Sequence, residues 1–252
     1  MISKVQSVCY AFLTRLPCNI RNGATHLQRW LNNSVFPPPG VALSNQSLST
    51  IRVVGVSGSL REKSYTRMAV AIALQGASDL GAETRLLDLR EYGLSFSEEE
   101  FESKIPSPGV ARMRQDFKAA HGIILGTPEY HGSFSGILKY ALDLMGFEEF
   151  GGKMVGLVAV SGGALGGANA LAGLRTVGRA LHAWVVPEQV SISEGWRVFD
   201  ADGRIKDARL ENALKEIGRQ VARFAFLHLS EQAREFLKAW ESAQPNPGGH
   251  RR

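Results

Sequence analysis

From Ile51 onward, short apolar runs alternate with segments whose apolar residues have a helical spacing. Apolar runs of about four to eight residues, rich in β-branched side chains, are typical of buried strands, whereas apolar residues about three or four positions apart indicate helices. The pattern predicts strands at residues 51–56, 84–89, 122–126, 154–160 and 184–190. It predicts helices at residues 65–80, 110–119, 137–145, 168–181 and 210–239.

Strands that alternate with helices predict an α/β fold. Five apolar strands of this kind form a parallel sheet with helices on both faces, that is, a three-layer sandwich. In such a sheet, ligands bind outside the carboxyl ends of the strands, where the strand order reverses. We therefore expect the functional residues in the loops that follow the first, third and fourth strands.

The loop after the first strand has the composition of an anion site. Ser57 and Ser59 flank a glycine, and Arg61, Ser64 and Thr66 follow where a helix begins. Hydroxyl groups and unpaired N–H groups at a helix start donate hydrogen bonds, and the helix dipole favours an anion there. A structural turn needs one capping hydroxyl rather than several, so the loop predicts a terminal phosphate site.

Two further loops are candidate binding loops. Residues 127–136 contain Pro128, Glu129, Tyr130, His131 and Gly132, a rigid and aromatic stretch that is longer than a routine connection of about two to six residues. A surface turn is the alternative. After the fourth strand comes a glycine-rich turn, in which exposed N–H groups can face a ligand; a flexible connection explains it equally well. This turn begins with Ser161, Gly162 and Gly163.

Charge and cysteine content exclude several classes of function. The net charge is +5, but residues 1–49 carry four basic and no acidic side chains, which leaves 25 basic against 24 acidic ones in the rest. No basic stripe remains, so nucleic-acid binding is not expected. Cys9 and Cys18 both lie in the first segment, and the histidines have no metal-ligand spacing. No apolar run is long enough to span a membrane.

The chain divides by composition into three parts. Residues 1–49 are basic, free of acids and rich in Ser and Asn, which resembles an organelle transit peptide; a disordered or misassigned start is nearly as good an explanation. Residues 50–242 form the predicted domain, and residues 243–252 a flexible tail. The expected location is the plastid stroma or mitochondrion if the first part is a transit peptide, and the cytoplasm if the protein is bacterial.

Taken together, GVSGSLREKSYT (55–66), TPEYHGSFSGILKYALD (127–143) and the Ser-Gly-Gly turn (161–163) resemble the NAD(P)H-dependent FMN reductase family of the flavodoxin-like fold. The family includes quinone, azo-dye and chromate reductases, and the resemblance covers residues 51–226. It implies strand order 2-1-3-4-5 and an FMN cofactor at the reversal of strand order. It also implies hydride transfer from NADPH or NADH, a small-molecule acceptor (a quinone, free flavin, azo compound or metal oxyanion), and a homodimer or homotetramer.

The resemblance also implies roles for individual residues. Ser57, Ser59, Arg61, Ser64 and Thr66 would hold the FMN phosphate, with Leu60 in the same loop. Pro128, Glu129, Tyr130, His131 and Gly132 would line the isoalloxazine ring, and Ser161, Gly162 and Gly163 would close its other edge. Many members have Asn at the positions of Thr66 and His131, and His131 is equally well explained as a packing residue of its loop. No side chain is expected to act as the catalyst, because FMN carries the hydride chemistry.

Two other functions fit parts of the pattern. A flavodoxin-type electron carrier would share the fold, but such carriers are usually strongly acidic and this domain is nearly neutral. A Rossmann NAD-binding protein would place an acid after its second strand, as Asp88 is placed. However, Asp88 lies thirty residues beyond Gly58 and the glycine triplet is missing, so we interpret Asp88 as a residue that caps the following loop. Arg175 and Arg179, four residues apart on one helix face, would contact nicotinamide nucleotide phosphates or form surface ion pairs.

Overall fold

The structure is a computed structural model that describes residues 50–95, 106–164 and 166–229. Four parts of the sequence lie outside the described residues: the expected N-terminal extension, the acidic segment SEEEFES at residues 97–103, the end of the last predicted helix and the C-terminal tail.

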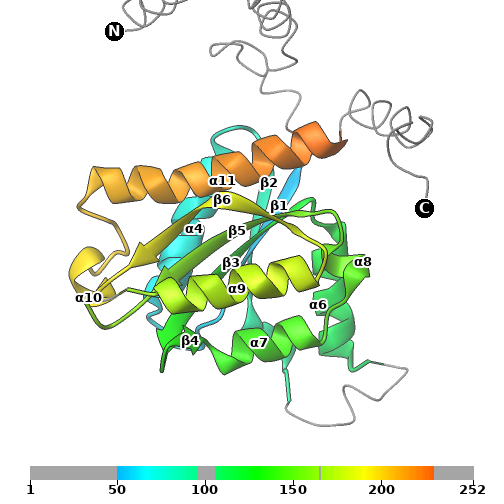
Figure 1. Cartoon of the computed structure of the whole chain (residues 1–252), viewed down its shortest axis with the longest axis horizontal. Coiled ribbons are helices and arrows are strands. Elements are labelled where there is room, and N and C mark those ends of the chain that lie inside the picture. Colours follow the sequence, from blue (N-terminus) through cyan, green and yellow to red (C-terminus); the bar gives the residue numbers. More distant parts are fainter. Residues whose placement is uncertain (1–49, 96–105, 165, 230–252) are drawn as a thin grey trace, which may run out of the picture. The chain divides into compact units, whose positions relative to one another are not determined.

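Five parallel strands form the central sheet, in the order β2-β1-β3-β5-β6 (Figure 1). They are β1 (Arg52–Ser57), β2 (Glu83–Asp88), β3 (Gly122–Tyr130), β5 (Met154–Val160) and β6 (Trp184–Ile192). Counted along the chain, these parallel strands have the order 2-1-3-4-5, so the predicted topology is confirmed. The sixth strand, β4 (Ser133–Phe134), pairs antiparallel with the end of β3 and was not predicted.

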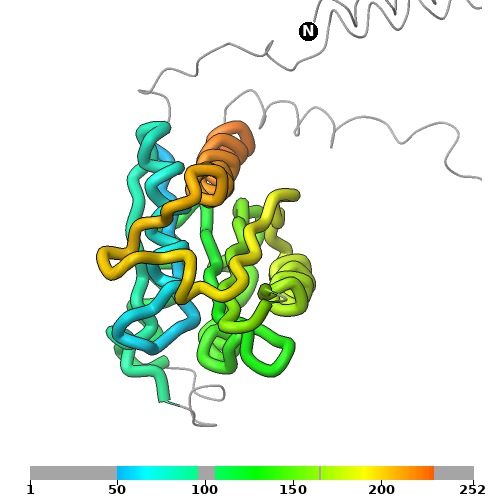
Figure 2. Tube along the Cα trace, turned by 90° about the vertical axis from the view of Figure 1, so that its left-hand side faces the viewer, coloured from blue at the N-terminus to red at the C-terminus, as the bar shows by residue number. Residues whose placement is uncertain are grey.

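Helices cover both faces of the sheet. Neighbouring residues of a strand point to opposite faces, and Val53 and Val54 accordingly belong to two separate hydrophobic clusters. Helices α4 (Tyr65–Ser78) and α11 (Ala208–Leu229) pack on the face of Val53. Helices α6 (Pro108–Ala119), α7 (Gly136–Asp143) and α9 (Ala168–Ala180) pack on the face of Val54. Figure 2 looks nearly along α9 (yellow-green) and α11 (orange).

Three short helices were not predicted, because four residues are too few to show a helical period. They are the 3₁₀ helix η1 (Leu89–Tyr92), α8 (Phe147–Phe150) and α10 (Gly195–Val198). Asp88 caps η1, since its carboxylate accepts the N–H of Arg90 at 3.0 Å. This agrees with the reading of Asp88 as a capping residue. None of the described helices is long and apolar enough to cross a membrane.

The sheet register brings three connections to one edge. Ser57 at the end of β1 pairs with Gly126 of β3, and Pro128 of β3 pairs with Val160 at the end of β5. Because the strands are parallel, the loops that follow β1, β3 and β5 leave the sheet on the same side. The candidate residues from distant parts of the sequence therefore meet at this edge.

Candidate functional site

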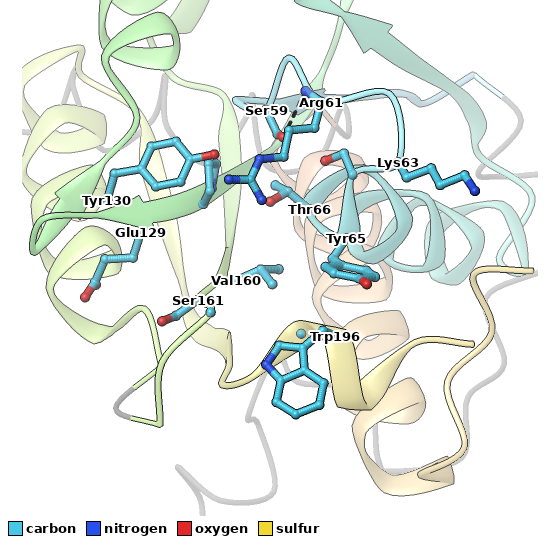
Figure 3. A pocket seen from close by; sticks show the side chains of 14 residues that line it. Ser59, Arg61, Lys63, Tyr65, Thr66, Glu129, Tyr130, Val160, Ser161 and Trp196 are labelled. Carbon is cyan, nitrogen blue, oxygen red and sulfur yellow. Dashed lines mark hydrogen bonds between the residues drawn. The ribbon is translucent and has the colours of Figure 1, made fainter. Parts of the chain in front are cut away.

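A cleft of about 190 Å³ lies at the carboxyl edge of the sheet (Figure 3). The loops after β1, β3 and β5 line it, and α10 forms a further wall. Nine of the residues predicted from the sequence meet here: Ser59, Arg61, Ser64, Thr66, Pro128, Glu129, Tyr130, Ser161 and Gly162. Five lining residues were not predicted: Lys63, Tyr65, Val160, Gly195 and Trp196.

The serine hydroxyls shape the first loop and keep their own protons to donate. Ser57 Oγ accepts the N–H of Ser59 at 3.4 Å, and Ser59 Oγ accepts the N–H of Arg61 at 3.4 Å. Ser64 Oγ caps α4 by accepting the N–H of Arg67 at 3.1 Å. A hydroxyl that accepts in this way still has an O–H to donate. The loop is therefore already folded as a set of hydrogen-bond donors.

The start of α4 adds unpaired donors and positive charge. Among the described residues, no acceptor faces the backbone N–H groups of Tyr65 and Thr66, which belong to the first turn of this 14-residue helix. Arg61 and Lys63 line the same cleft. Helix N-termini and cations both favour a bound anion. The Thr66 hydroxyl lies beside them in the cleft (Figure 3).

Arg67 stabilises the loop after β1 through hydrogen bonds to its backbone, a role that the sequence did not reveal. Its guanidinium donates to the carbonyl oxygens of Glu62 at 2.9 Å and Arg61 at 3.1 Å, and it forms a 3.4 Å ion pair with Asp88. The hydrogen bond from Arg90 is the main cause that lowers the pKa of Asp88, with a further contribution from Arg67. Asp88 thus holds the loop through Arg67.

The second predicted loop is a β-hairpin. Strand β3 continues to Tyr130 and pairs with β4, so that Tyr130 lies opposite Ser133. His131 and Gly132 form the turn with φ of 51° and 76°, and two successive positive φ angles are typical of the type I′ turn that joins paired strands. The expected long loop at residues 127–136 is therefore corrected to a tight hairpin.

Hydrogen bonds attach this hairpin to the loop between β1 and α4 (residues 58–64), which we call the serine loop. Thr127 Oγ1 donates to the carbonyl oxygen of Pro128 at 2.8 Å and accepts the N–H of Ser135 at 3.0 Å. Ser135 Oγ donates to the carbonyl oxygen of Gly58 at 2.6 Å, and the N–H of Gly58 donates to the carbonyl oxygen of Gly126 at 2.8 Å. Thr127 and Ser135 are buried. The two walls of the cleft are thus held in a fixed relation.

Glu129 differs from its neighbours in the hairpin. Its carboxylate accepts the N–H of Ala170, in the first turn of α9, at 2.9 Å. Figure 3 shows this side chain pointing away from the serine loop. The expected contact of Glu129 with a bound ring would therefore come from its backbone rather than from its carboxylate.

The third wall joins the end of β5 to α10. The N–H of Ser161 donates to Ile192 at 2.8 Å, and the N–H of Gly195 donates to Ser161 at 3.1 Å, both to carbonyl oxygens. A Cβ on Gly195 would lie 2.7 Å from Val160 Cγ1, so only glycine allows this approach. Trp196 then reaches the cleft with 54% of its surface exposed. In the sequence, the available signal for this wall was a tryptophan shortly after the last predicted strand.

Five predicted residues do not line the cleft. Ser57, the last residue of β1, is buried, and Leu60 is half exposed. His131 and Gly132 form the hairpin turn, and Gly163 donates its N–H to Ser161 Oγ at 2.9 Å. Their contacts with a ligand stay predictions.

Arg175, a candidate for binding nucleotide phosphates, forms hydrogen bonds within the fold. Its guanidinium donates to the carbonyl oxygens of Val186 at 3.1 Å and Pro187 at 3.2 Å, and to Gln189 Oε1 at 2.8 Å. These contacts hold the irregular part of β6, where the pairing with β5 shifts register. Among the described residues, no group of three or more His, Cys, Asp and Glu side chains is arranged to hold a metal ion.

Comparison with known proteins identifies the family of this chain. Residues 51–197 match the family model of NADPH-dependent FMN reductases. The NAD(P)H-dependent FMN reductase PA1204 of Pseudomonas aeruginosa is 34% identical over 171 residues, which cover 66% of this chain and 90% of that protein. An NADPH azoreductase of a Bacillus species is 33% identical over 168 residues, which cover 66% of this chain and 90% of that protein.

The fold is shared with a solved structure from Paracoccus denitrificans. The flavoenzyme NAD(P)H:(acceptor) oxidoreductase FerB superposes with a TM-score of 0.57 at 20% identity, covering 71% of this chain and 98% of that chain. The family match spans the serine loop, the hairpin and α10, and it therefore includes every wall of the cleft. The chain belongs to the NADPH-dependent FMN reductase family.

Proposed function

We propose that the cleft binds FMN and that the protein is an NAD(P)H-dependent flavin oxidoreductase. One observation carries the proposal: donors suited to a phosphate and an aromatic hairpin suited to a planar ring line a single cleft. Ser59 in the loop after β1, and Ser64 and Thr66 at the start of α4, are buried hydroxyl residues, and Tyr130 lies on the neighbouring wall.

The phosphate end of the cleft fits a dianion. The hydroxyls of Ser59, Ser64 and Thr66 face it together with the N-terminal N–H groups of α4. The guanidinium of Arg61 adds positive charge inside the cleft, whereas the Lys63 side chain points away from it (Figure 3). Charge-assisted hydrogen bonds to a phosphate are the stronger kind. Glu129, the acid among the lining residues, is turned to the start of α9. Nothing acidic in the lining therefore competes for these donors.

The other end of the cleft fits a flat ring. Pro128 and Tyr130 form one wall on the hairpin, and Ser161 and Gly162 form the wall after β5. Bound FMN would supply the hydride-accepting chemistry, as it does in flavoenzymes generally. The protein's residues would then bind and orient the cofactor and its nicotinamide donor, and limit the access of water.

The electron acceptor and the assembly are part of the proposal. The azoreductase among the relatives supports a small organic acceptor such as an azo compound or a quinone. The family resemblance supports a homodimer or homotetramer, which light scattering of the purified protein would measure. A location in the cytoplasm, plastid stroma or mitochondrion is inferred only from the composition of residues 1–49.

A titration tests the proposed function. The purified protein is incubated with excess FMN, freed of unbound flavin, and titrated with NADPH and NADH under nitrogen, with and without a quinone. We expect a flavin absorption spectrum that is lost on addition of the nicotinamide and restored by the quinone. Bound flavin that stays oxidised would indicate an electron carrier of the flavodoxin type, and the absence of any bound flavin would contradict the proposal.

A further inference from the structure

We infer that Glu129 is a positioning residue, which sets the spacing between the two walls of the cleft by capping helix α9. The inference rests on the proposed binding of FMN, because the ring would lie between those walls. The hydrogen bond between Glu129 and Ala170 joins residues 41 positions apart in the sequence.

Helix α9 has no side-chain cap of its own. Its N-cap residue is Gly167, which lacks a side chain, and its first turn contains no acidic residue. Glu129, which belongs to β3, supplies both missing features. Its carboxylate is an acceptor for the N–H of Ala170, and it places a negative charge at the positive end of this 13-residue helix. A capping carboxylate stabilises a helix start through both effects.

The position of Glu129 in the hairpin makes this cap relevant to the cleft. Side chains alternate along a strand, so Glu129 points away from the side chains of its two neighbours, Pro128 and Tyr130, which line the cleft. A second contact ties the same hairpin to α9, because a Cβ on Gly173 would lie 2.7 Å from the ring of Phe134. The hairpin wall therefore moves with α9.

The opposite wall is also connected to α9. Ser161 and Gly162 lie on the connection between β5 and α9, a segment rich in glycine. Its last residue, Gly167, donates its N–H to Ser191 Oγ at 2.8 Å. The Glu129 carboxylate thus bridges the hairpin wall to the helix that ends the other wall. Loss of this bridge removes a restraint on the distance between the two walls.

Two substitutions separate the hydrogen bond from the charge. Glu129→Gln keeps an oxygen that accepts the N–H of Ala170, and Glu129→Ala removes it. Asp207→Ala is the matched control, because Asp207 Oδ1 also accepts a backbone N–H near a helix start, that of Arg209 at 2.8 Å, in an exposed place outside the cleft lining. All three variants are made in the full chain.

The first measurement needs no cofactor. Amide hydrogen exchange of the FMN-free protein should be faster in the first turn of α9 for Glu129→Ala than for the wild type, and nearly unchanged for Glu129→Gln. The second measurement is the dissociation constant for FMN from a fluorescence titration. We expect about a tenfold weaker FMN affinity for Glu129→Ala, in line with the usual effect of losing a helix cap, and a change within about threefold for Glu129→Gln and Asp207→Ala.

Two results would overturn the inference. Unchanged exchange in Glu129→Ala would show that the cap does not hold α9, and unchanged FMN affinity in Glu129→Ala would show that the cap does not act on the cleft. An FMN affinity of Glu129→Gln as low as that of Glu129→Ala, with faster exchange in both, would support the cap and assign its effect to the carboxylate charge. Failure of the wild type to bind FMN would instead contradict the proposed function, and the exchange measurement would still decide whether Glu129 holds α9.

Discussion

Ser135 Oγ donates a 2.6 Å hydrogen bond to the carbonyl oxygen of Gly58, 77 positions earlier in the chain. Ser135 also caps α7 by accepting the N–H of Leu138 at 3.4 Å. One buried hydroxyl therefore joins the serine loop, the hairpin and a helix start. A Cβ on Gly58 would lie 2.7 Å from this hydroxyl, which explains why the position is a glycine.

Ser135→Ala should weaken both the fold and FMN binding. The substitution leaves the Gly58 carbonyl oxygen without its buried donor, which typically costs about 1–3 kcal/mol. Urea unfolding should show that loss, and an FMN titration should show reduced affinity, because the serine loop is no longer held against the hairpin. Ser133→Ala, at the exposed first residue of β4 in the same hairpin, is the control and should change neither quantity. Equal behaviour of the two variants would show that the bond to Gly58 does not matter.

Arg61→Ala should lower the affinity for FMN by about tenfold without changing the free energy of unfolding. Arg61 is exposed at the cleft and its guanidinium lies 5.9 Å from the centre of the Tyr130 ring, so its removal leaves the core intact. The expected size reflects a charge-assisted hydrogen bond weakened by solvent exposure. Riboflavin, which lacks the phosphate, should bind the variant and the wild type alike. An unchanged FMN affinity would argue against a phosphate at this loop.

Asp88→Asn should destabilise the protein at neutral pH, and by less in acid. The pKa of Asp88 lies below its ordinary value of 3.8, mainly because of the hydrogen bond from Arg90. A lowered carboxyl pKa gives a stabilisation that is fully present above the unfolded-state value and is lost as the pH falls through the folded-state value. Urea unfolding of both proteins between about pH 6 and pH 3 should therefore show a difference that shrinks as the pH falls. A constant difference would mean that the Asp88 charge does not stabilise the fold.

Trp196 should report FMN binding through its fluorescence. It lines the cleft, whereas Trp184 lies at the opposite end of β6 with 61% of its surface exposed. Titration with FMN should quench the tryptophan emission of the wild type and of Trp184→Phe. Most of this quenching should be missing in Trp196→Phe. The same quenching in all three proteins would place the flavin far from α10.

The five predicted strands show which parts of the structure can be predicted from neighbouring residues in the sequence. Buried strands carry their signal in consecutive residues, so the five parallel strands and their order followed from apolar runs and a family resemblance. The serine loop was equally readable, because the residues that cap a helix and shape its start are neighbours in sequence. The hairpin could not be predicted in this way. Pro128 lies inside β3, and a proline within an apolar run usually argues against a strand.

The pattern of the sequence by itself determined the layered α/β fold, and the family resemblance of its motifs implied the strand order. Of the fourteen site residues named from the sequence, nine line one cleft. Only the tertiary structure decided how that cleft is held together. Three contacts join residues between 21 and 77 positions apart. They are the ion pair of Arg67 with Asp88, the hydrogen bond from Ser135 to Gly58, and the hydrogen bond by which Glu129 caps α9. Such contacts depend on which strands and helices become neighbours. A single polar contact between distant residues leaves no periodic pattern in the chain, unlike the burial of a strand or a helix face.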